Sequence, residues 1–89
     1  MSHFVIVRHQ VRDFPAWKIA FDAHAGKRRE SGLTDRQLLR NADNTSEVVI
    51  VLQAADLSRA RAFAASDDLR QTMQAAGVID RPDITFLDD

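Results

Sequence analysis

The feature that most constrains this chain is a short segment near its start that is apolar on both of its alternating sides. Residues 4–11 read Phe-Val-Ile-Val-Arg-His-Gln-Val and are rich in the β-branched side chains that favour strands. Successive side chains of a strand point to opposite faces of the sheet, so Phe4 and Ile6 share one face and Val5 and Val7 share the other. Because both sets are apolar, the segment predicts a central strand that is covered on two sides.

The next segment carries the signals of an amphipathic helix that ends at a glycine. Asp13 is suited to cap the helix, and Pro15 is tolerated in a first turn. Apolar residues then recur at helical spacing, at Phe14, Trp17, Phe21 and Ala25. This pattern predicts one helix over residues 14–30, stopped by Gly32.

A hairpin and a broken helix are predicted to follow. Residues 33–41 and 47–54 read as strands, and the turn residues Ala-Asp-Asn-Thr lie between them. Asp56 can cap a further helix, and Ser66 can cap the chain again, followed by two aspartates suited to the positive end of a helix dipole. Gly77 is a typical residue just after a helix, and residues 84–87 read as a last strand.

The order of these elements predicts an α+β fold of the ferredoxin-like βαββαβ type, formed by residues 1–89 as a single domain. Right-handed crossovers place both helical segments on one face of a four-stranded antiparallel sheet. The other face then stays bare over roughly 300 Å² in projection, for strands of about five residues. An apolar patch of that size indicates an interface, and a chain this short gains from a partner, so we expect a homodimer.

The parity of the strands decides which residues form that interface. Ile6, with Phe4, belongs to the apolar pair that excludes the parity of His9, and we expect it on the bare face. On the third strand the sequence leaves two sets open. Either Val49 and Val51 or the alternate set of Val48, Ile50 and Leu52 faces the partner.

Composition and charge exclude several functions. The 12 basic and 13 acidic residues are interspersed and give a net charge of −1, which provides no footprint for nucleic acid. Cysteine is absent, which removes disulfides, thiolate catalysis and cysteine-ligated metals. No apolar run is long enough for a membrane span, and no export signal is readable, so we expect a cytoplasmic protein without a membrane partner.

The whole chain resembles the dimeric α/β-barrel superfamily, which includes antibiotic-biosynthesis monooxygenase-like proteins and small bacterial proteins labelled as cyclases. The resemblance rests on the βαββαβ order and on a local pattern. That pattern comprises Val7-Arg8-His9-Gln10-Val11, Asp13-Phe14, Trp17-Lys18, Phe21-Asp22, His24, Arg28, Gly32 and Leu38-Leu39-Arg40-Asn41. It implies a homodimer with the two sheets face to face and a pocket between sheet and helices. It implies no particular reaction, and where haem-degrading members carry Asn this chain has Val7.

His9 and His24 are the candidate catalytic residues. His9 shares a strand face with Val5 and Val7, and His24 projects about 20° from Trp17 on a helical wheel. If these faces meet, two imidazoles line one cavity beside an indole and could move a proton of an acidic C–H or a phenol. The alternative is that each ring is half-buried and satisfied by a carbonyl or carboxylate.

Trp17 and Arg40 are the candidate substrate-binding residues, as a stacking surface and as a guanidinium for a carboxylate or enolate. Trp17 can equally anchor the core, and Arg8, Arg36 and Arg40 can be rim charges paired with Glu47 or Asp43. The spacing of potential ligands predicts no metal site, and no phosphate loop predicts a nucleotide or other cofactor.

Two hypotheses follow from the sequence. In the first, the protein binds or converts a small apolar or aromatic, polyketide-like molecule without a cofactor, in a pocket of several hundred cubic ångströms. In the second, it is a non-enzymatic dimeric module whose space between sheet and helices is filled by side chains.

Overall fold

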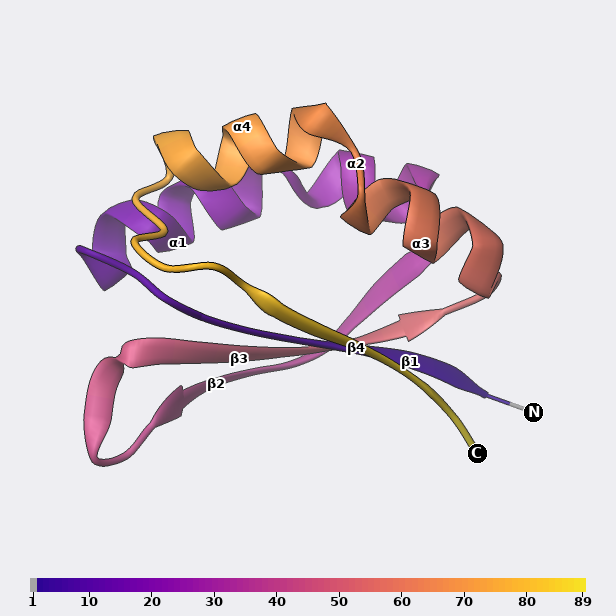
Figure 1. The fold of residues 1–89 in the computed structure, drawn as a ribbon, viewed down its shortest axis with the longest axis horizontal. Coiled ribbons are helices and arrows are strands. Elements are labelled where there is room, and N and C mark those ends of the chain that lie inside the picture. The colour runs from indigo at the N-terminus through magenta and orange to yellow at the C-terminus, as the bar shows by residue number, and fades with distance from the viewer. Residues whose placement is uncertain (1) are drawn as a thin grey trace.

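The computed structural model describes residues 2–89 and shows a four-stranded sheet with all of its helices on one face (Figure 1). The first half of the chain forms β1 (His3–Gln10), α1 (Phe14–Ala23), α2 (Ala25–Glu30) and β2 (Leu33–Asn41). The second half forms β3 (Asn44–Ala54), α3 (Leu57–Ala64), α4 (Asp67–Ala75) and β4 (Asp83–Asp88). The predicted ferredoxin-like α+β fold is confirmed. Among the described residues, no helix is both long and apolar enough to span a membrane.

The strands lie in the order β2-β3-β1-β4, and each neighbouring pair is antiparallel. In the register of the central pair, Val7 lies opposite Ile50 and Ile6 lies opposite Val51. A bulge between Asp35 and Gln37 interrupts the pairing of β2 with β3. The ladder thus places β1 in the middle of the sheet, as the two-sided apolar pattern predicted.

The face of the sheet under the helices holds the core. Its buried residues come from alternate positions of the two central strands and are Val5, Val7, His9, Val48, Ile50, Leu52 and Ala54. Trp17 of α1 and Ala60 of α3 close this core from above. Of the two sets that the sequence left open on β3, the set of Val48, Ile50 and Leu52 therefore faces the helices.

The opposite face has no helix over it (Figure 1). Residues directly opposite in an antiparallel pair share a face, so Val51 and Thr85 lie on the same face as Ile6. The apolar members of this open face are Phe4, Ile6, Leu39, Val49, Val51 and Leu87. The expected position of Phe4 and Ile6 on the bare face is confirmed.

The first helix differs from its prediction because it is broken at His24 into α1 and α2. The carbonyl oxygen of Phe21 accepts a hydrogen bond from the guanidinium of Arg28 at 2.8 Å and one from the His24 N–H at 3.2 Å. An uninterrupted helix would give that carbonyl to the N–H four residues later. The side chain of Arg28 therefore takes the place of a helical bond, and the axis turns at this point.

Other local predictions hold, except that β3 begins at Asn44, so two of the four residues expected in the turn belong to the strand. Asp56 caps α3 through the N–H groups of Ser58 and Arg59, and the Ser66 hydroxyl accepts from the Leu69 N–H at the start of α4. Gly77 follows α4 with a φ of +89°, in the left-handed region that favours glycine. The expected break between two helices on this crossover is confirmed.

Candidate functional site

A small apolar cavity lies between the sheet and the helices. It measures about 70 Å³ and is walled by β1, β3 and all four helices. Its lining comprises Val7, His9, Trp17, Ala20, Phe21, His24, Arg28, Ile50, Leu52, Phe63, Leu69, Thr72, Met73 and Ala76. An engineered cavity that accepts benzene measures about 150 Å³, so in this arrangement the space is too small for a six-membered ring.

His9 is the polar group at the floor of this cavity. Its side chain projects from β1 toward the helices and is only 2% exposed. Neither Nδ1 nor Nε2 has a hydrogen-bond partner among the atoms of residues 2–89. Burial lowers the pKa of His9 below its usual value, and the nearby carboxylate of Asp80 opposes that effect only in part. His9 is therefore a neutral imidazole with a free donor and a free acceptor.

His24 enters the same cavity from the break between α1 and α2. Its ring stacks on Phe63 of α3, with 5.9 Å between the centroids. The Nε2 atom is buried and lies 3.6 Å from a carboxylate oxygen of Asp68, which is beyond hydrogen-bond length. The Nε2 atom of His24 therefore has no hydrogen-bond partner among the described residues.

Trp17 belongs to a column of aromatic rings along α1. Its indole stacks on Phe21 at 5.0 Å and meets His9 edge-on at 5.5 Å. Phe14 continues the column at 5.7 Å from Trp17. The spacing of three and four residues puts these rings on one face of the helix, and that face forms one wall of the cavity. Trp17 is both a core residue, 3% exposed, and part of the lining.

Arg28 lines the cavity, and the sequence analysis gave it no role there beyond its place in the resemblance pattern. Its guanidinium is buried, makes two 2.9 Å hydrogen bonds to the Asp35 carboxylate, and lies 3.7 Å from the centroid of Phe21. The guanidinium thus has three partners, which are the Asp35 carboxylate, the Phe21 ring and the Phe21 carbonyl. Its burial could have been predicted from the helical wheel, on which Arg28 lies about 20° from Phe21. The basic run Lys27-Arg28-Arg29 suggested an exposed charge cluster instead.

The structure places Arg40 outside the cavity lining. Its guanidinium lies 4.0 Å from the centroid of Phe14 and donates a 3.0 Å hydrogen bond to the Thr45 carbonyl. The two arginines therefore lie at opposite ends of the aromatic column. Arg28 lies over Phe21 at the cavity end, and Arg40 lies over Phe14 at the far end. Arg8 lies on the open face, where it pairs with Glu47 at 3.1 Å and with Asp83 at 2.8 Å, as its rim-charge interpretation expected. Residues 2–89 contain no cluster of three or more side chains suited to hold a metal.

Comparisons with solved structures give the same architecture. A putative antibiotic biosynthesis monooxygenase from Bordetella bronchiseptica superposes with a TM-score of 0.79 at 11% identity, covering 99% of this chain and 96% of that one. One from Caulobacter crescentus gives 0.75 at 17% identity, covering 99% and 89%. The chain has the fold of the antibiotic biosynthesis monooxygenases.

SnoaB from Streptomyces nogalater, a cofactor-independent oxygenase, shares this fold. It superposes with a TM-score of 0.76 at 16% identity, covering 99% of this chain and 92% of that one. No family model and no curated protein matches the chain by sequence. At these identities the likeness establishes the antibiotic biosynthesis monooxygenase fold, and function rests on the residues of this chain.

Proposed function

We propose that the protein is a cytoplasmic homodimer that binds a small, largely apolar or aromatic molecule between its sheet and helices. The observation that carries the proposal is His9, an imidazole 2% exposed whose two ring nitrogens are both unpaired by protein atoms. A buried polar group without a partner costs about 1–3 kcal/mol, so the His9 nitrogens call for a partner such as a ligand, a reacting group or an ordered water. An apolar ligand with one polar group would give one of the two His9 nitrogens a partner.

The two histidines support different roles in a cofactor-free reaction. The neutral His9 can donate one hydrogen bond to a carbonyl or hydroxyl oxygen and accept another. His24 presents a buried Nε2 atom, without a hydrogen-bond partner among the described residues, from the helical side of the cavity. We therefore propose proton abstraction from an acidic C–H or a phenol, in which the proton passes to the free imidazole nitrogen of His24 and leaves an anion near His9.

The dimer is proposed from the open face of the sheet. Its apolar centre is formed by Ile6 and Val51, and Leu39 and Leu87 are 48% and 43% exposed in the single chain. The pairs of Arg8 with Glu47 and Asp83 lie beside this centre. A second copy would cover the same face in a two-fold arrangement, and the helices and the cavity would stay on the outside of each sheet.

Deuterium exchange tests the proposed reaction. In D₂O, the protein should accelerate exchange at the carbon next to the carbonyl of 2-indanone, a small apolar probe with an acidic C–H. His24→Gln should abolish the acceleration and keep binding, while His9→Leu should weaken both. Binding without any acceleration would rule out the enzyme and leave a binding protein.

The second candidate is a non-enzymatic dimeric module. The cavity volume of about 70 Å³ favours it, because a ligand-binding enzyme pocket usually measures at least about 300 Å³. Native mass spectrometry of the purified dimer separates the two candidates. A small molecule that travels with the dimer supports the first. A dimer that arrives empty and binds no added probe supports the second.

A further inference from the structure

The cavity has a larger neighbour on the other side of helix α4. A groove of about 600 Å³ runs between α4 and residues 78–84, which lead into β4. Leu69 and Met73 line both this groove and the cavity that contains His9. These two side chains are therefore a shared wall between a large outer space and a small inner one.

Helix α4 is the least anchored helix over the cavity. It contributes no buried residue, whereas Trp17, Arg28 and Ala60 are buried from α1, α2 and α3. Elements with few buried contacts open at low cost in free energy. Met73 is also an unbranched side chain with three rotatable bonds, which adapts easily to a changed space.

The two spaces differ in character. The inner cavity is walled mainly by apolar side chains, and its guanidinium, Arg28, is already bound by Asp35. The outer groove carries two arginines and two aspartates, Arg70, Arg81, Asp67 and Asp80. Their formal charges cancel, so the groove offers hydrogen bonds without selecting an anion or a cation.

We infer that Leu69 and Met73 form a gate between the two spaces and select an elongated, neutral ligand with one apolar and one hydrogen-bonding end. With the gate open, the apolar end lies against His9 and Trp17 and the other end lies in the groove. This inference rests on the proposed function, since it assumes that the inner cavity is the binding site. It explains how a cavity of about 70 Å³ admits a ring.

Tryptophol, an indole with a neutral hydroxyethyl tail, is a suitable probe. Its association and dissociation are followed by NMR line shape for the wild type and for Met73→Ala, with Leu69→Ala as a second gate variant. Truncation of the gate should raise both rates about tenfold, which corresponds to a barrier lower by about 1.4 kcal/mol, and Met73→Trp should lower both rates by a similar factor. Thr72→Ala and Gln74→Ala are matched controls, because Thr72 lines only the cavity and Gln74 only the groove.

The outcomes separate the gate from the site. If the wild type binds tryptophol and the Met73 and Leu69 variants bind it with the same association and dissociation rates, the gate is overturned. The proposed function then still stands. Binding by Met73→Ala alone supports the gate, and binding by neither protein overturns the proposed function as well. Tryptophol should bind up to about tenfold more tightly than indole, because its hydroxyl adds a hydrogen bond in the groove. Tighter binding of tryptamine or indole-3-propionate than of tryptophol would overturn the neutral ligand class.

Discussion

The imidazole of His9 packs edge-on against the indole of Trp17, with 5.5 Å between the ring centroids and 73° between the planes. The contact joins the central strand to the first helix at the floor of the cavity. Neither ring nitrogen of His9 has a hydrogen-bond partner among the described residues. Trp17 therefore orients the His9 ring, and both nitrogens of that ring can form hydrogen bonds with a ligand.

Replacing His9 by leucine should not destabilise the protein. The substitution removes two unpaired buried nitrogens, and we expect the free energy of unfolding to rise by about 1 kcal/mol. Urea unfolding of His9→Leu and wild type measures the difference. A loss of stability of about 1 kcal/mol or more would mean that the ring nitrogens are hydrogen-bonded in solution.

Stability should depend on pH through His9. Burial lowers the pKa of His9 in the folded state, so below pH ~6.5 the unfolded chain binds the proton more readily than the folded one. Folding is then progressively weakened as the pH falls from about 7.5 toward 5. Urea unfolding across this range should show a smaller loss in His9→Leu than in wild type. Equal losses would assign the effect to other groups.

We expect that lysine cannot replace the planar guanidinium of Arg28 without a loss of stability. Arg28→Lys keeps the charge but loses the two-pronged contact with Asp35 and the stacking on Phe21, and should cost about 1–3 kcal/mol of unfolding free energy. Lys18→Arg, at an exposed ion pair with Asp22, is the conservative control and should change little. A neutral Arg28→Lys would mean that neither the two-pronged contact with Asp35 nor the stacking on Phe21 contributes to stability.

Dimer formation should depend on the open face. A lysine in place of Ile6 would bury an unpaired ammonium in the interface, and wild type at 2 × 10.0 = 20.0 kDa should become a 10.0 kDa monomer. Ile19→Lys is the matched control, because Ile19 is 73% exposed on α1, away from the sheet. Sedimentation equilibrium measures both. A monomeric wild type, or a folded dimeric Ile6→Lys, would contradict the face-to-face arrangement.

Much of the fold is readable from local sequence signals. The caps at Asp56 and Ser66 and the two-sided apolar pattern of residues 4–11 depend on nearest neighbours, and the structure agrees with them. The parity of β3 could not be predicted, because both of its alternating sets are apolar and only the pairing with β1 decides between them.

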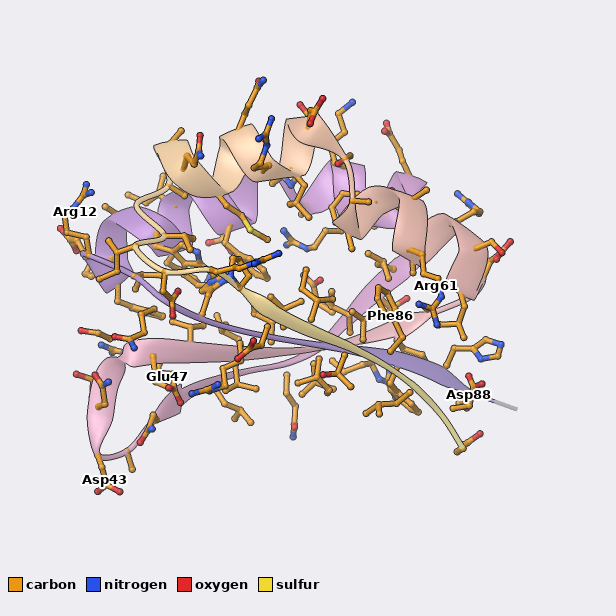
Figure 2. The ribbon with its side chains drawn as sticks, in the orientation of Figure 1. Arg12, Asp43, Glu47, Arg61, Phe86 and Asp88 are labelled. Atoms are coloured by element: carbon orange, nitrogen blue, oxygen red, sulfur yellow. The ribbon has the colours of Figure 1, made fainter. Side chains whose placement is uncertain are left out.

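The misread parts of the sequence depend on contacts between distant elements. The burial of Arg28 next to the break at His24 is accompanied by a tertiary contact with Asp35 of the second strand. Figure 2 gives another such case, where Arg61 of α3 reaches down to Phe86 of β4, 4.4 Å from its ring centroid. Asp43, at the tip of the hairpin in the same view, is far from the helices.

The central claim is that the unpaired ring of His9 is a ligand site, and NMR of that ring tests it most directly. Long-range ¹H–¹⁵N spectra report the two imidazole nitrogens, and tryptophol is titrated into the wild type. We predict saturable shifts of the His9 nitrogens and of the Trp17 indole N–H, at one ligand per chain, and none at His3, the first residue of β1. His9 nitrogens that stay unchanged at saturating tryptophol would contradict the account.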